Sequence, residues 1–270
     1  MIYELGILGA GNMAEAIVRG VLGKGLLQPQ QVIAADPVAA RRELFEGTLG
    51  IKCVADNAEV ARQAKTILLS TKPYQINEAL SPVGRVMNEQ TLVISIAAGV
   101  TSQAIADALG AGKRWRVIRS MPNTPMLVGE GIVGVAAGVG ATAGDVAAAR
   151  RIFEAAAEVV EVAEDKIDAV TALSGSGPAY VYFLVESMTR AGVEMGLSPA
   201  DARKMAIKTA VGAGKLLSAS SDEPAELRRK VTTPGGTTEA AINHMTRMNW
   251  PGITVEAIKA AEQRGRELGK

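Results

Sequence analysis

The sequence is poor in the side chains on which many active sites depend. Its 270 residues include one cysteine, Cys53, and one histidine, His244. A single cysteine excludes internal disulfides and any metal site built from several thiolates, and we interpret Cys53 as incidental. His244 lies in a predicted helix near the end of the chain, where a packing or surface role is favoured over catalysis. These absences exclude much hydrolase and metalloenzyme chemistry, and we expect no metal site.

An excess of one charge and long apolar runs are also lacking. The 29 basic residues nearly balance the 28 acidic ones, and no basic stripe is interleaved with aromatic side chains, so we expect no nucleic-acid partner. The first residues carry neither a signal-peptide pattern nor a membrane-spanning run. We therefore expect a cytoplasmic protein without a membrane partner, in one large domain or two modest ones.

What is present begins with a glycine-rich turn. An apolar strand is predicted over residues 5 to 8, and helical sequence follows from residue 14. Gly9 permits a tight turn, Gly11 leaves room for a pyrophosphate, and Ala14 allows the helix to pack closely on the strand. This order of strand, glycine turn and helix predicts a dinucleotide site. Its predicted cofactor residues here are Gly9, Ala10, Gly11, Asn12 and Met13.

Further strands alternate with helical sequence through the first half. We predict them at residues 32 to 35, 66 to 70, 92 to 96, 117 to 120 and 132 to 136. Such alternation indicates an α/β fold, a Rossmann domain with a doubly wound and mostly parallel sheet. Ligands bind outside the carboxyl ends of such strands. The segments there are small, hydroxylated or rich in proline: Thr71, Lys72 and Pro73, then Ala97 and Ala98, then residues 121 to 125.

Asp36 ends the second predicted strand, where an acidic side chain would hold the adenosine ribose hydroxyls. That position favours NAD over NADP. Arg41 and Arg42 follow at the start of the next helix, and either one would be able to neutralise a 2′-phosphate or simply face solvent. The sequence therefore leaves the preference between NADH and NADPH open.

Beyond about residue 162 the strand patterns give way to helices. We place a Rossmann domain at residues 1–162 and an all-α domain for substrate binding and dimerisation at 163–270. An apolar stripe in the second domain is too extensive for five helices to cover, so we expect a homodimer through it. The stripe consists of Val181, Leu184, Val185, Met188, Gly192 and Met195.

Two segments of small residues interrupt the helices. Residues 174 to 180 allow a ligand or a neighbouring backbone to approach closely, as would a tightly packed helix junction. Residues 231 to 238 end in Pro-Gly-Gly-Thr-Thr, which is able to point several N–H groups at one carboxylate or phosphate. Alone, this second segment is equally compatible with an ordinary turn between helices. Beside a dinucleotide domain we favour an anion site.

Taken in order, these segments resemble those of the pyrroline-5-carboxylate reductase family over essentially the whole chain. The matching segments are residues 9 to 13, 71 to 73, 95 to 99, 119 to 125, 173 to 180 and 231 to 238. The resemblance implies a Rossmann domain, a helical dimerisation domain, use of NADPH or NADH, and dimers that often join as decamers. It also implies that Asn57, Lys72 and Ala97 line the cofactor.

The implied reaction is hydride transfer from NAD(P)H to the imine carbon of 1-pyrroline-5-carboxylate, which gives L-proline. Water is able to protonate this cyclic imine before it binds, so orientation and electrostatics suffice and no histidine is needed. We predict that N–H groups from Gly236 to Thr238 hold the carboxylate and that the Thr238 hydroxyl approaches the ring nitrogen, with Thr171 and Ser176 as wall residues. The predicted substrate residues are Val231, Thr233, Gly235, Gly236, Thr237 and Thr238.

Two positions depart from the family pattern. Ser221 and Lys230 stand where some members have glutamate and asparagine, so those side-chain contacts do not transfer. Two other functions would suit parts of this sequence. A 3-hydroxyacid dehydrogenase would need a catalytic lysine that residues 174 to 190 lack, since carbonyl reduction requires an acid. A non-enzymatic dinucleotide sensor would not explain the predicted anion-binding turn at residues 231 to 238.

Overall fold

The computed structural model describes residues 2–268, and these divide into two compact units. Among these residues, the first unit comprises 2–176 together with 261–268, and the second comprises 177–260. Our predicted boundary at 162/163 stays a prediction. The two compact units divide at 176/177, and residues 261–268 belong to the first of them.

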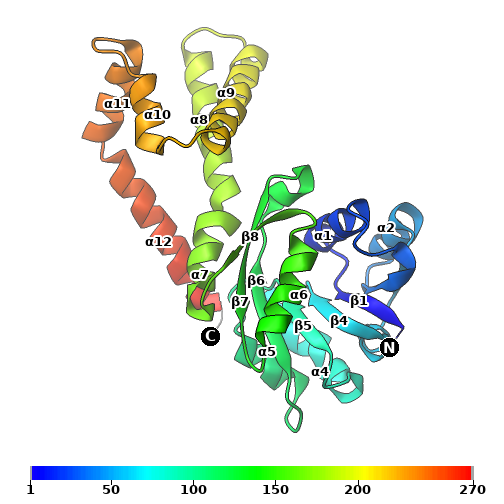
Figure 1. Ribbon diagram of the computed structural model, residues 1–270. Coiled ribbons are helices and arrows are strands. Elements are labelled where there is room, and N and C mark those ends of the chain that lie inside the picture. Colours follow the sequence, from blue (N-terminus) through cyan, green and yellow to red (C-terminus); the bar gives the residue numbers. More distant parts are fainter. Residues whose placement is uncertain (1, 269–270) are drawn as a thin grey trace. The chain divides into compact units, whose positions relative to one another are not determined.

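The first unit is built on a single eight-stranded sheet (Figure 1). Its strands are β1 (Tyr3–Leu8), β2 (Val32–Ala35), β3 (Lys52–Val54), β4 (Ala64–Leu69), β5 (Leu92–Ser95), β6 (Arg116–Met121), β7 (Gly131–Ala137) and β8 (Ala157–Glu161). They lie in the order β3-β2-β1-β4-β5-β6-β7-β8, and only the β6–β7 pair is antiparallel. The predicted mostly parallel, doubly wound sheet is confirmed.

Helices cover both faces of this sheet (Figure 1). The helices of the first unit are α1 (Asn12–Gly23), α2 (Ala39–Leu49), α3 (Asn57–Gln63), α4 (Ile76–Val86), α5 (Ser102–Leu109), α6 (Ala143–Phe153) and α7 (Ile167–Val170). Neighbouring strand residues such as Ile7 and Leu8 are both fully buried but belong to different core clusters. Side chains alternate across a strand, so burial of both neighbours requires a core on each face.

Short turns of helix complete the first unit. They are η1 (Pro29–Gln31), η2 (Pro73–Gln75), η3 (Thr124–Val128), η4 (Glu164–Lys166) and the π-helical turn η5 (Thr171–Gly175). Two strands, β3 and β8, were not predicted. In β3 only the central residue is buried, and β8 has no fully buried residue, so neither presents the apolar run by which the other strands are recognised.

The second unit is helical. It contains α8 (Gly177–Glu194), α9 (Pro199–Ala219), α10 (Pro224–Lys230), α11 (Thr237–Arg247) and most of α12 (Trp250–Leu268). Helix α9 has a capped start: Ser198 Oγ accepts a 3.1 Å hydrogen bond from the Asp201 N–H, and Pro199 occupies the first turn. Across residues 2–268, no helix combines the length and the apolar character that crossing a membrane requires.

Candidate functional site

The glycine-rich turn follows β1 in a conformation that suits a dinucleotide. Gly9 has a positive φ of 95°, and a Cβ there would lie 3.0 Å from the Ser70 carbonyl oxygen. At Gly11 a Cβ would meet no atom within 4 Å, so the space beside that backbone is open. Helix α1 begins directly afterwards, and the N–H groups of its first residues, Asn12 to Ala14, have no carbonyl within the helix to bond. The turn thus presents N–H groups and a positive helix end to an anion.

A cavity of about 430 Å³ opens at the carboxyl edge of the sheet beside this turn. The strand order reverses there, between β1 and β4, which is where doubly wound sheets bind their ligands. Six of the predicted cofactor residues line it: Gly9, Gly11, Asp36, Asn57, Thr71 and Lys72. The others lie outside its lining, in the turn after β1, at the start of α1, or after β4 and β5: Ala10, Asn12, Met13, Pro73, Ala97 and Ala98.

Some polar side chains that line this cavity have hydrogen-bond partners within the protein, and one does not. Ser70 Oγ donates to the Leu8 carbonyl oxygen at 3.1 Å, and Asn57 Nδ2 reaches the Ala79 carbonyl oxygen at 3.4 Å. Thr71 Oγ1, in contrast, is buried and has no hydrogen-bond partner among residues 2–268. A buried hydroxyl without a partner is costly unless something else bonds it. A polar ligand in the cavity would supply that bond.

Asn123 joins the loop after β6 to the π-helical turn η5. Its side chain is 7% exposed; Nδ2 donates to the Ser174 carbonyl oxygen at 3.2 Å and Oδ1 accepts from the Ile132 N–H at 3.0 Å. We had not predicted Asn123 as a site residue, although its segment was recognised as unusual for the end of a strand. π-Helical turns are rare and often mark functional sites. We therefore add Asn123, which bonds to this turn, to the candidate site residues.

The predicted wall residues Thr171 and Ser176 lie in or next to η5, within the first unit. Thr171 Oγ1 donates to the Ile167 carbonyl oxygen at 2.8 Å, and the Ser176 N–H donates to the Thr171 carbonyl oxygen at 2.8 Å. Because the Thr171 hydroxyl hydrogen is used within its own helix, a ligand would meet the oxygen's free lone pair. Thr171 is therefore suited to accept a hydrogen bond rather than to donate one.

The predicted substrate turn lies in the second unit, between α10 and α11. Gly235 has a φ of 71°, and the Gly236 N–H donates to the Thr233 carbonyl oxygen at 2.9 Å. Helix α11 starts at Thr237, which leaves the N–H groups of Thr237 and Thr238 without helical partners. Of the predicted carboxylate donors, the Gly236 N–H is used inside the turn, whereas these two have no helical partner. Val231 and Thr233 are exposed before it.

Lys230 at the leading edge of this turn forms an ion pair with Asp222. The hydrogen bond from Lys230 holds the pKa of the Asp222 carboxyl below its ordinary value, and the same bond raises the pKa of Lys230. The positive charge of Lys230 is therefore compensated by Asp222. Lys230 and Ser221, the neighbour of Asp222, are the two positions where the chain departs from the family pattern. An exposed pair of this kind contributes little to stability.

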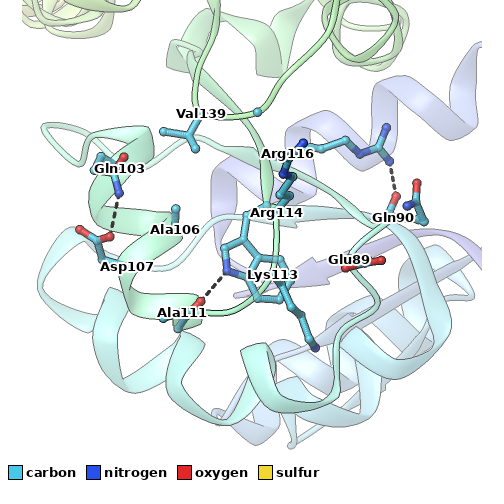
Figure 2. Close-up of a pocket in the computed structure, with 13 residues that line it drawn as sticks. Glu89, Gln90, Gln103, Ala106, Asp107, Ala111, Lys113, Arg114, Arg116 and Val139 are labelled. Carbon is cyan, nitrogen blue, oxygen red and sulfur yellow. Dashed lines mark hydrogen bonds between the residues drawn. The ribbon is translucent and has the colours of Figure 1, made fainter.

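A second cavity near the sheet, of about 860 Å³, is not this site (Figure 2). It lies at the amino ends of β5 and β6, opposite to the edge where α/β sheets bind ligands. Two of its three cations have partners within the protein: Lys113 Nζ donates to the Gly84 and Met87 carbonyl oxygens, at 3.1 and 2.8 Å, and Arg116 pairs with Asp145 at 2.8 Å. In the part of the chain described, no cluster of three or more His, Cys, Asp or Glu side chains is arranged to hold a metal ion.

Both halves of the chain match families of known proteins. Residues 164–268 match the family model for pyrroline-5-carboxylate reductase dimerisation, and residues 4–99 match the model described as NADP oxidoreductase, coenzyme F420-dependent. The pyrroline-5-carboxylate reductase of Synechocystis sp. is 39% identical over the full length of both chains. That of Coxiella burnetii has been solved and superposes with a TM-score of 0.90 at 33% identity, covering both chains completely.

A solved reductase from Plasmodium falciparum, with NADP bound, is similar over 99% of this chain and 98% of its own, with a TM-score of 0.87 and 25% identity. The similarity to these proteins spans the Rossmann unit, the helical unit and every segment on which the site was predicted. The chain belongs to the pyrroline-5-carboxylate reductase family.

Proposed function

We propose that the chain reduces 1-pyrroline-5-carboxylate to L-proline with NADH or NADPH. The observation that carries the proposal is the cavity at the β1–β4 switch point, with its glycine turn and unbonded Thr71 hydroxyl, in a chain that matches the reductase family from end to end. The two alternatives from the sequence, a 3-hydroxyacid dehydrogenase and a dinucleotide sensor, have no comparable support.

The residues present fit a dinucleotide. The N–H groups of Asn12 to Ala14 would hold its pyrophosphate, and Thr71 and Lys72 would contact it from the end of β4. When bound, the nicotinamide supplies a hydride, which the C=N carbon of the cyclic imine accepts as its bond electrons move to nitrogen. The protein's share is to bind the substrate, orient it and exclude water.

The substrate carboxylate would be held by the N–H groups of Thr237 and Thr238 at the positive end of α11. The Thr238 hydroxyl, as predicted, would approach the ring nitrogen. Thr171, in the first unit, stays a predicted wall residue whose oxygen is able to accept a hydrogen bond. A protonated imine needs no further acid, which agrees with the position of His244 near the end of α11 rather than at its start.

The same family assignment supports assembly through the helical unit. Large apolar side chains are exposed on α8 and α9, among them Val181 (49%), Phe183 (71%) and Met205 (56%). Surfaces of this kind are normally covered by a partner. We propose a homodimer through this unit and, as in other family members, dimers that join into a decamer. The oligomeric state in solution, measured by light scattering, tests this.

The reaction is tested by steady-state oxidation of NADH and NADPH in the presence of 1-pyrroline-5-carboxylate, with L-proline identified as the product. We expect turnover with at least one cofactor, dependent on both substrates. The matched control omits the imine, since a diaphorase-like background oxidises the cofactor without it. An absence of proline formation with either cofactor would overturn the proposed function.

A further inference from the structure

The carboxylate of Asp36 is fixed between two backbone N–H groups. Asp36 follows β2 and is 8% exposed. Its Oδ2 accepts from the Ala10 N–H at 2.8 Å, and its Oδ1 accepts from the Val38 N–H at 2.8 Å. Both oxygens are thus held, one by the glycine-rich turn and one by the residue before α2. This carboxylate is not free to swing out of the cavity that it lines.

The cavity that Asp36 lines has more negative than positive side chains. Its lining includes the carboxylates of Asp36, Asp56 and Glu78, and Lys72 is the one lining residue with a positive charge. The end of β2 is where a dinucleotide fold places the adenosine ribose. A 2′-phosphate, which carries up to two negative charges, would come next to Asp36 there. Like charges in a partly enclosed site repel strongly, whereas a 2′-hydroxyl is able to donate to the carboxylate.

The two arginines that would neutralise a 2′-phosphate are used elsewhere. Arg41 donates to the Ala10 carbonyl oxygen through Nε and pairs with Glu15 at 3.0 Å. Arg42 donates to the carbonyl oxygens of Asp36 and Pro37, at 2.9 and 2.8 Å. Neither arginine lines the cavity. In this fold, both arginines therefore have partners other than a 2′-phosphate.

The ion pair that holds Arg41 persists over the range in which the enzyme would work. Burial by itself raises the pKa of the Glu15 carboxyl, but hydrogen bonds from Arg19 and Arg41 outweigh burial and keep the pKa below its ordinary value. Glu15 therefore stays ionised at neutral pH and keeps its pair with Arg41. To reach a 2′-phosphate, Arg41 would have to leave both Glu15 and the Ala10 carbonyl oxygen.

We propose that Asp36 makes this chain prefer NADH over NADPH, a specificity that rests on the proposed reductase function. The fold itself does not impose this preference, since the related Plasmodium falciparum protein was solved with NADP bound. The discrimination comes from one fixed carboxylate and from two arginines that have other partners.

The test compares kcat/KM for NADH and NADPH at saturating 1-pyrroline-5-carboxylate. For the unmodified protein we expect a preference for NADH of about tenfold or more. Asp36→Ser and Asp36→Asn should each reduce that ratio by about tenfold, mainly through a lower KM for NADPH. Two variants are used because Asp36 also fixes the turn, and Tm is measured for both. Glu43→Gln is the matched control, since it removes one exposed carboxylate from α2 outside the cavity and should leave the ratio within about twofold.

Dissociation constants of NADH and NADPH, measured by calorimetry without the imine, separate this inference from the proposed function. Tight NADH binding without proline formation would overturn the function and leave the specificity standing. A ratio near one or in favour of NADPH in the unmodified protein would overturn the specificity alone. So would an Arg41→Ala variant that selectively lost NADPH binding, because the arginine would then be the group that meets the 2′-phosphate.

Discussion

The Glu239 carboxylate accepts a 2.8 Å hydrogen bond from the Gly235 N–H, at the start of α11. Glu239 is the third residue of that helix and reaches back over its first turn. Such a bond stabilises the helix start, because it satisfies an N–H that the helix cannot. It also places a negative charge beside the N–H groups of Thr237 and Thr238, where we propose that the substrate carboxylate binds.

Removing that charge should therefore strengthen substrate binding. Glu239→Gln retains an oxygen that is able to accept from Gly235 and removes the negative charge. We expect KM for 1-pyrroline-5-carboxylate to fall by about two- to fivefold, the size of a single charge at a helix end. Glu256→Gln, an equivalent change on α12, is the control and should leave KM unchanged. A rise in KM for Glu239→Gln would place the substrate carboxylate elsewhere.

The hydroxyl of Thr238 is the side chain that we expect to matter most for turnover. Thr238→Ala should lower kcat/KM by about ten- to hundredfold, as expected for a lost hydrogen bond to a charged group. Thr238→Ser should retain most of the activity. Thr246→Ala is the control on the same helix, because its hydroxyl donates to the Ile242 carbonyl oxygen at 2.8 Å and is not part of the turn. Unchanged kcat and KM in Thr238→Ala would remove Thr238 from the site.

The crossing of α4 and α5 depends on Gly84. A Cβ at this position would lie 1.7 Å from the Leu109 carbonyl oxygen, so Gly84→Ala must separate the two helices. We expect the free energy of unfolding to fall by at least about 2 kcal/mol, as in other overpacked cores. Gly47→Ala in α2 is the matched control, since a Cβ there meets no atom within 4 Å. It should stabilise the protein by roughly 0.5–1 kcal/mol through helix propensity. Urea unfolding measures both, and a neutral Gly84→Ala would contradict the packing.

Cys53 should make stability fall at alkaline pH. Burial, together with the charges of Asp36 and Glu46, raises the pKa of its thiol from 9.0 to about 11. Between these values the unfolded chain loses the thiol proton while the folded chain retains it, so folding is disfavoured as pH rises through that window. At pH 10 the cost is about 1 kcal/mol.

The measurement is the difference in unfolding free energy between the unmodified protein and Cys53→Ala, at pH 7 and at pH 10. Lysines and tyrosines titrate in both proteins and cancel in the difference. We expect the stability advantage of the unmodified protein to shrink by about 1 kcal/mol at the higher pH. An equal difference at the two pH values would show that the thiol ionises alike in the folded and unfolded chains.

Much of the fold could be predicted because the strands that build the core are short, apolar and buried on both faces. β2 and β5, each with four fully buried residues, are examples. β3 and β8 were missed because they lie at the two edges of the sheet and their residues are largely exposed or half-buried. An edge strand forms because its neighbour offers unpaired backbone groups, and that neighbour is not visible in the local sequence.

For the site, the sequence by itself determined which residues are available: a glycine turn, an aspartate after β2, small residues after each strand and a glycine-threonine helix start. The partners of those residues were decided by the tertiary structure. Asp36 bonds Ala10 across 26 positions, Arg41 pairs with Glu15 across 26, and Asn123 reaches Ser174 across 51. A charge acts according to its distance from other charges, and these distances exist only once the chain is folded. The composition of the site therefore follows from the sequence, whereas the cofactor preference that we propose rests on the fold.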